Sequence, residues 1–261
     1  MKIDKDLYTS HIKNDEKRFE MRKLLGKIEL VLKNHSIEST DFLDPYERYL
    51  AKSIINRFDD IKYKEFGGTS NSERKVIFIY PDYLDEHYLD FNLTYLRVKG
   101  VVDGLTHKDY LGSLLSLGIK RSKTGDILVH KDYADIILKN EIGNFVLQNL
   151  DKVGGNKVSL SEIEAEELTE PTVNFRELSL FISSMRLDAF LSSIYNISRH
   201  ESINIIKNGN VKVNWEEILK PSKELNVGDN ISTRGHGRAM IKSIDGFSKK
   251  GRLHITVQIL I

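Results

Sequence analysis

The chain has 261 residues, of which 40% are hydrophobic and 30% are charged, so it can bury sizeable cores and is unlike a disordered or collagen-like protein. Its formal net charge is +1, and therefore no overall excess of charge marks it as a partner of nucleic acid or membrane. Cysteine is absent, which excludes disulfides, thiolate nucleophiles and cysteine-bound metals.

The first 60 residues are predicted to form a helical N-terminal module. The first helix has an apolar stripe that consists of Phe19, Leu24, Leu25, Ile28, Val31 and Leu32. A second helix would begin at the N-cap residue Asp44, with Pro45 at the first helical position. The second helix would present Tyr46, Leu50, Ile54 and Phe58.

The region 61–170 alternates short β-rich runs with helical ones. Strands are predicted at 61–66, 75–80, 93–98, 125–130 and 157–164. Helices are predicted at 106–118, where Thr106 and Asp109 form a capping-box pattern, and in two pieces at 131–141 and 142–150. This alternation indicates an α+β layer of the ferredoxin-like type, with a strand order that the pattern leaves open.

The charge is divided unevenly along the chain. Residues 185–261 contain 12 basic and 7 acidic side chains, a net of +5, and the rest of the chain has a net of −4. An acidic stretch at 162–170 precedes Pro171, which is typical of a linker or a strand edge. We therefore place a connecting segment at 171–184 and a basic C-terminal domain at 185–261.

The C-terminal domain is predicted to pack two short helices on a small sheet. Leu187, Phe190, Leu191 and Ile194 follow the helical repeat, and a second helix begins at Ser198. Extended segments follow at 211–214, 231–244 and 253–261.

Exposed basic side chains are concentrated in this domain. Arg186 and Arg199 stand at the beginnings of adjacent helices, where free backbone N–H groups and the helix dipole favour phosphate. Arginine also binds two phosphate oxygens at once. Each cation alone is as well explained by an ordinary solvated surface, but their concentration favours a polyanion site. The set is Arg186, Arg199, Lys207, Lys212, Arg234 and Arg238.

Four segments in this order resemble the S4-like (alpha-L) RNA-binding domain. They are Met185–Leu191, Ser198-Arg199, Ile206–Asn214 and Val227–Arg238. The resemblance implies binding of structured rRNA or tRNA through the two helices and the following strand and turn. On this basis the RNA-binding residues are Arg186, Ser198, Arg199, Lys207, Lys212, Asn214, Arg234, Gly235, His236, Gly237 and Arg238.

Two further segments, Thr40–Pro45 and His107–Asp126, resemble the YlmH family of bacterial RNA-binding proteins. That resemblance spans nearly the whole chain and implies an RNA-recognition-motif-like (RRM-like) middle domain. It also implies a factor that binds rRNA and tRNA on the large ribosomal subunit, together with quality-control factors acting on stalled nascent chains in translation. We expect the protein to be non-enzymatic and monomeric. Neither a cofactor nor a metal is expected.

The middle domain lacks the aromatic signature with which RRM domains stack bases. Phe78, Tyr80 and Tyr95 are scattered and are expected in the core. Secondary RNA contacts are instead assigned to a loop that carries Lys120, Arg121 and Lys123, with a merely solvated loop as an equal alternative.

Enzyme functions are also considered. Arg186-Leu187-Asp188 is similar to the element around the catalytic aspartate of pseudouridine synthases, but a carboxylate in the first turn of a helix is favourable for structural reasons. The chain shows neither paired metal-ligating histidines nor a phosphate-binding glycine loop. The alternatives are an RNA-modifying enzyme with its site in the middle domain, and a scaffold for cell-division proteins that uses the segment 162–170.

The start of the chain has no apolar run typical of a signal peptide. Nor does any later run approach the roughly 20 apolar residues that are needed to cross a bilayer. The expected location is therefore the cytoplasm, without membrane association.

Overall fold

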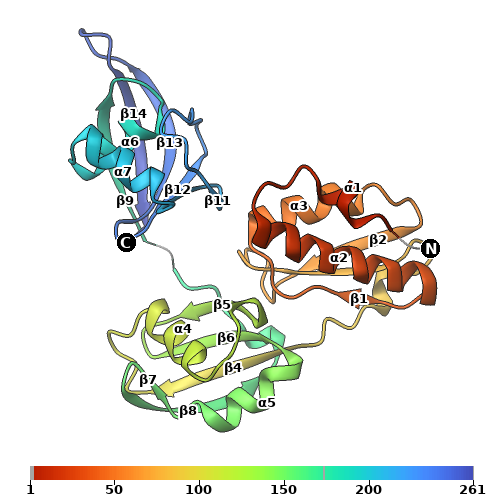
Figure 1. Ribbon diagram of the computed structural model, residues 1–261. Helices are drawn as coiled ribbons and strands as arrows, with labels where there is room; N and C mark the ends of the chain where they lie inside the picture. The colour runs from red at the N-terminus through yellow and green to blue at the C-terminus, as the bar shows by residue number, and fades with distance from the viewer. Residues whose placement is uncertain (1–2, 173, 261) are drawn as a thin grey trace. The chain divides into compact units, whose positions relative to one another are not determined.

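The computed structural model describes residues 3–172 and 174–260, and it divides into two compact units, Met1–Pro171 and Thr172–Ile261 (Figure 1). The first unit contains a three-stranded and a five-stranded sheet, and the second contains a six-stranded sheet. This mixture of helices and sheets confirms the predicted α+β class. Within the described residues, no helix is long and apolar enough to cross a membrane.

The N-terminal part of the first unit packs three helices on the three-stranded sheet. The helices are α1 (Lys5–Thr9), α2 (Asp15–Asn34) and α3 (Pro45–Ile55). The strands are β1 (Glu38–Ser39), β2 (Ile61–Phe66) and β3 (Val76–Pro81), in the order β1-β3-β2. Asp44 caps α3 as predicted, because its carboxylate accepts the Glu47 N–H at 2.8 Å while the Glu47 carboxylate accepts the Asp44 N–H at 2.7 Å. Phe19, which was expected in the core, is 59% exposed.

The N-terminal module ends later in the structure than at the predicted boundary, residue 60. β3 pairs with both β1 and β2, so the sequence up to Pro81 belongs to the N-terminal sheet. Every residue of β3 is buried. Ile77 and Ile79 face the helices, whereas Phe78 packs toward the middle domain. The change of period at residue 61 marks the first long strand of the module, not its end.

The middle domain has the predicted ferredoxin-like topology. Its elements are β4 (Leu93–Gly100), α4 (His107–Ser116), β5 (Thr124–Val129), β6 (Tyr133–Lys139), α5 (Asn140–Asn149), β7 (Lys152–Val153) and β8 (Asn156–Ile163). Single 3-10 turns lie at Glu86–Tyr88, Arg121–Lys123 and Ala165–Glu167. The strand order is β5-β6-β4-β8-β7 with antiparallel neighbours, and both helices cover one face.

One element of this domain is predicted wrongly. The segment 131–141, expected to be helical, contains the central strand β6. Ile136 and Leu138 pack under the helices, whereas Ile137 and the buried Asp135 lie on the other face, so the strand is buried on both sides. A strand buried on both faces lacks the polar alternation that distinguishes it from a buried helix.

The second face of the middle sheet is covered by the N-terminal part. Tyr95 and Ile137 share one apolar cluster with Phe42, Phe78 and Tyr80. The buried positions of the three aromatic residues Phe78, Tyr80 and Tyr95 agree with their expected place in the core. The two parts of the first unit therefore share a core.

The second unit packs α6 (Leu187–Tyr195) and α7 (Arg199–Lys207) against one face of an antiparallel sheet. Its strands are β9 (Phe175–Ile182), β10 (Val211–Val213), β11 (Glu216–Glu217), β12 (Asn230–Thr233), β13 (Gly237–Phe247) and β14 (Leu253–Leu260). The order is β11-β10-β12-β13-β14-β9. Helical residues such as Phe190 and Ile206 meet inward-facing strand residues such as Val213 and Ile255.

The segment predicted as a connection at 171–184 contains a strand of this sheet. β9 pairs with β14 from Phe175 to Ile182, and Ile182 is fully buried in the core of the second unit. We expect a fragment that begins at Thr172 to fold, and a fragment that begins at Met185 to lose about 3 kcal/mol or more of stability, because Ile182 and its partly buried neighbours are removed from the core. Urea unfolding of the two fragments measures the difference, and equal midpoints would contradict the expectation.

Candidate RNA-binding surface

Two of the predicted arginines are held by one buried carboxylate. Arg186 donates from Nε and Nη2 to the two carboxylate oxygens of Asp188, at 3.0 and 2.8 Å. Arg199 donates from Nε and Nη2 to Asp188 Oδ2, at 3.3 and 3.2 Å. The Asp188 side chain is 1% exposed, whereas those of Arg186 and Arg199 are 41% and 55% exposed. We call this group the Asp188 clamp.

The clamp lies where both helices of the unit begin. Arg186 is the N-cap residue of α6, and Arg199 is the first residue of α7. Hydrogen bonds from Arg186, with the charge of Arg199, hold the pKa of the Asp188 carboxyl below its usual range, so Asp188 stays ionised. Two guanidinium groups against one carboxylate leave a net positive charge at two helix N-termini, which suits a phosphate group.

Ser198 has a structural task at the same place. As N-cap of α7, its hydroxyl accepts the Glu201 N–H at 3.1 Å. This is the predicted start of the helix, and it fixes the backbone that carries Arg199.

Three predicted cations lie exposed near the other end of α7. Lys207 is in its last turn, Lys212 is in β10, and Arg234 begins the turn between β12 and β13. The Arg234 N–H donates to the Asn210 carbonyl at 2.9 Å, which ties this turn to the segment after α7. Within the described residues, the three side chains form no ion pair, so their charges are available to an anion.

The predicted glycines shape that turn. Gly235 and Gly237 have φ values of 84° and 91°, a region in which other residues are strained. Between them His236 stacks on Tyr195 of α6, with ring centroids 4.4 Å apart. The turn is therefore fixed against the helices.

Arg238 and Lys212 lie on the sheet face opposite the helices. Lys212 is paired with Ser232, and Ser232 with Arg238, so the three side chains form one row across the strands. The Arg238 guanidinium lies over the Trp215 ring at 5.3 Å and donates to Ser232 Oγ at 3.3 Å. Trp215 was not predicted, although it is the single tryptophan of the chain and directly follows the Val-Lys-Val-Asn motif.

Asn214 is used inside the domain. It and Trp215 form a two-residue hairpin turn, with φ values of 49° and 65°. Its amide donates to Asp229 Oδ1 at 2.8 Å and accepts the Asn230 N–H at 2.9 Å. This asparagine positions the strand that carries Lys212. The sequence analysis assigned Asn214 to RNA binding and did not predict this structural role.

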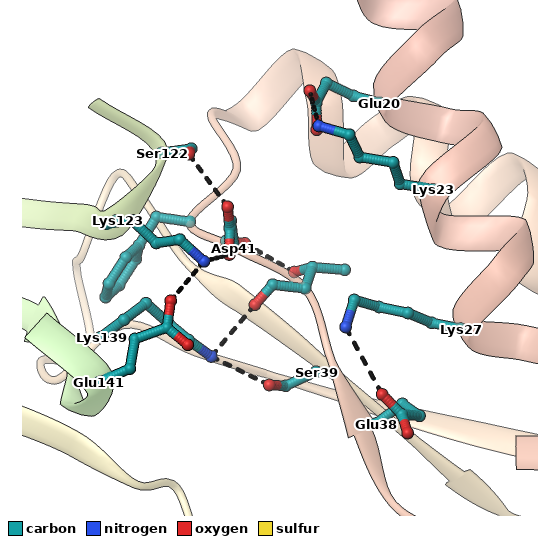
Figure 2. A network of polar contacts seen from close by, with 12 residues as sticks. Glu20, Lys23, Lys27, Glu38, Ser39, Asp41, Ser122, Lys123, Lys139 and Glu141 are labelled. Atoms are coloured by element: carbon teal, nitrogen blue, oxygen red, sulfur yellow. Dashed lines mark hydrogen bonds and ion pairs between the residues drawn. The ribbon is translucent and has the colours of Figure 1, made fainter. Parts of the chain in front are cut away.

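The predicted secondary site in the middle domain is mostly committed to internal contacts. The Arg121 guanidinium donates to the Thr124 and Gly125 carbonyls at 2.7 and 3.0 Å, and burial lowers its pKa to about 10. Lys123 bridges Asp41 at 2.6 Å and Glu141 at 2.5 Å (Figure 2). Lys120 is the exposed member of the set.

The sheet face on which RRM domains stack bases is closed over part of its area. Tyr95 is 8% exposed, under the N-terminal part of the unit. Toward the other end of this sheet face, the Arg97 guanidinium donates to both carboxylate oxygens of the buried Asp135, at 2.8 and 2.9 Å, and to the Glu167 carbonyl at 3.0 Å. Stacking of RNA bases on these two central strands would require those contacts to open.

The fold and the basic surface define a protein with a C-terminal S4 RNA-binding domain, and the S4 domain model matches residues 185–231. The model of the YlmH N-terminal domain matches residues 16–84, and that of the RNA-binding domain in YlmH matches residues 86–167. Over 255 residues the chain is 32% identical to ribosome-associated protein quality control protein P2 of Bacillus subtilis, with 97% of this chain and 98% of that protein covered. The chain belongs to the YlmH family.

A solved structure gives the same relationship. The chain is similar to the structure of cell division protein ylmH from Streptococcus pneumoniae, with a TM-score of 0.52 and 25% identity. The match covers 60% of this chain and 96% of that one. Because the matched families are RNA-binding domains, RNA binding is the role that they support for this chain.

Proposed function

We propose that the chain binds rRNA and tRNA on the large ribosomal subunit, in quality control of stalled nascent chains. The observation that carries the proposal is the basic surface of the second unit, where two helix N-termini and their arginines are arranged for phosphate. Support comes from the B. subtilis relative, whose name places it in ribosome-associated quality control and which aligns along nearly the whole chain.

The proposal is tested by co-sedimentation with purified large subunits. Removing Arg186 and Arg199 alone would leave the buried Asp188 carboxylate without a cationic partner, so the informative variant is Arg186→Gln with Asp188→Asn and Arg199→Gln. We expect this variant to stay folded, by circular dichroism, and to leave the ribosomal pellet. A folded variant that pellets as well as the unchanged protein contradicts the proposal.

The enzyme alternative based on Asp188 has little support. Both carboxylate oxygens are engaged, in five hydrogen bonds from Arg186, Arg199 and the Ala189 N–H, and the side chain is 1% exposed. A carboxylate held in this way is poorly placed to attack a base. Nucleoside analysis by mass spectrometry after incubation with RNA is the direct check, and a new modified nucleoside would favour catalysis.

A link to cell division is the second candidate function, because the similar S. pneumoniae structure is that of a protein named as a cell division protein. The segment 162–170 is a weaker partner surface than its charge indicates. The Glu170 carboxylate accepts the Asn71 N–H at 3.0 Å and the Asn71 side-chain amide at 2.6 Å. A division partner that is captured after nuclease treatment would support this candidate.

A further inference from the structure

A second feature of the C-terminal unit lies outside residues 185–231, to which the S4 model matches. It is the tip of the hairpin between β13 and β14, residues 247–252, which we call the hairpin tip. β12 pairs with β13 only from Gly237 to Met240, so the distal part of β13 extends beyond β12 (Figure 1). The hairpin tip therefore stands at the end of a projecting arm.

The hairpin tip has a defined turn. The Ser248 N–H donates to the Arg252 carbonyl at 2.8 Å, and the Gly251 N–H donates to the Ser248 carbonyl at 2.9 Å. The Arg252 N–H also donates to Ser248 Oγ at 3.0 Å. Gly251 has a φ of 73°, which closes the turn without strain.

An aromatic ring begins this turn and is left to solvent. Phe247 is 74% exposed. It pairs with Leu253, which in turn pairs with the buried Ile182, so the three residues share one face of the sheet and Phe247 continues the core row outward. Phe181 differs, because its ring stacks on His254 with centroids 4.7 Å apart. Within the described residues, the Phe247 ring has no stacking partner.

Three cations follow the ring within five positions. Lys249, Lys250 and Arg252 are exposed and form no ion pair within the described part of the chain. The nearest acidic residue of the hairpin is Asp245, whose carboxylate accepts the hydroxyls of Ser243 and Thr256, each at 2.6 Å. The tip thus combines an open aromatic face with uncompensated positive charge.

The hairpin tip and the Asp188 clamp lie at the same end of the sheet. β9 ends at Ile182, in the row of Phe247, and Arg186 follows four residues later. Two strand spacings separate Ile182 from Phe247 by about 10 Å. The chain from Ile182 to Arg186 spans at most about 14 Å. One folded RNA element can therefore reach both features.

We propose that the hairpin tip is a second RNA contact, where Phe247 stacks on an unpaired base and Lys249, Lys250 and Arg252 contact the adjacent phosphates. This inference rests on the proposed function, and it adds a preference for single-stranded loops to phosphate recognition at the clamp. Stacking on an aromatic ring accepts any base but requires one that is not already stacked in a duplex.

The test compares variants of the full chain by fluorescence anisotropy on two labelled RNAs: an eight-base-pair stem closed by seven uridines, and a blunt twelve-base-pair duplex. We expect Phe247→Ala and Phe247→Leu each to weaken binding of the looped RNA by about tenfold and to leave duplex binding unchanged. Phe247→Trp should restore loop binding. Because the ring is exposed, the melting temperature should not change in any of these variants.

The possible outcomes separate a failure of the hairpin-tip assignment from a failure of the proposed function. If the unchanged protein binds neither RNA, the proposed function fails together with the tip. If the looped RNA is bound equally by the unchanged protein and by Phe247→Ala, the tip assignment alone is wrong. Loss of ribosome co-sedimentation by Phe247→Ala without loss of RNA binding would assign the ring to a protein partner and would also overturn the inference.

Discussion

Replacing Lys207, Lys212 and Arg234 by glutamine is expected to weaken RNA binding by about a hundredfold or more at 0.1 M salt. Each cation that contacts a phosphate releases counterions, and the slope of log affinity against log salt falls by about 0.7 to 0.9 for each contact that is lost. Three lost contacts should therefore reduce that slope by about 2 to 3. Because the three side chains are exposed and outside the core, the fold should be unaffected.

The measurement is a salt series of filter-binding or anisotropy titrations. A matched control replaces Lys13, Lys33 and Lys131 of the first unit by glutamine, since these lysines are also exposed and form no ion pair within the described residues. The two variants have the same net charge, so only location differs. Equal losses in both would show that charge in general, and not this surface, drives binding.

Replacing Asp188 by alanine should destabilise the second unit by about 2 kcal/mol. The substitution leaves two guanidinium groups facing each other at helix N-termini, where positive charge is unfavourable, and it removes the acceptor for the Ala189 N–H. Both arginines are partly exposed and rehydrate, so the effect stays below that of a fully buried pair. RNA affinity should fall as well, because neither arginine keeps its position.

Urea unfolding measures the loss, and its pH dependence tests the cause. The pKa of Asp188 is lowered in the folded state, so its contribution is present above the unfolded value of about 3.9 and disappears as pH falls through the lower folded value. The difference between the unchanged protein and Asp188→Ala should therefore be constant near neutral pH and shrink below about pH 4. A difference that persists undiminished in acid would indicate packing instead of charge.

Much of the C-terminal unit could be predicted from sequence because its signals are local. The cap at Ser198 and the glycines around His236 each act within a few residues. The clamp was missed because Arg199 lies eleven positions after Asp188: sequence places Asp188 at a helix N-terminus but does not show Arg199 reaching it. Trp215 was missed because its partner, Arg238, comes from a later strand.

Burial on two sides explains one error in the first unit, the helix that was predicted at 131–141. β6 is buried on both faces, so it lacks the alternation that identifies a strand at the surface of a domain. Lys123 and Arg121 look like a free basic loop in sequence, but the fold brings Asp41 to Lys123, and nearby carbonyls such as that of Gly125 bind Arg121. A basic side chain in a predicted loop is therefore free to bind RNA only when the folded protein places no hydrogen-bond acceptor close to it.

The core shared by the two parts of the first unit bears on how such chains can be assembled from modules. Family models divide this unit at residues 84 and 86, yet Phe78 and Tyr80 on one side pack with Tyr95 and Ile137 on the other. Either half alone would present an aromatic face and would lose the Asp41–Lys123 bridge. Because the S4 unit has its own core, we expect recombination to exchange it as a module, whereas the other two segments are expected to be exchanged only together.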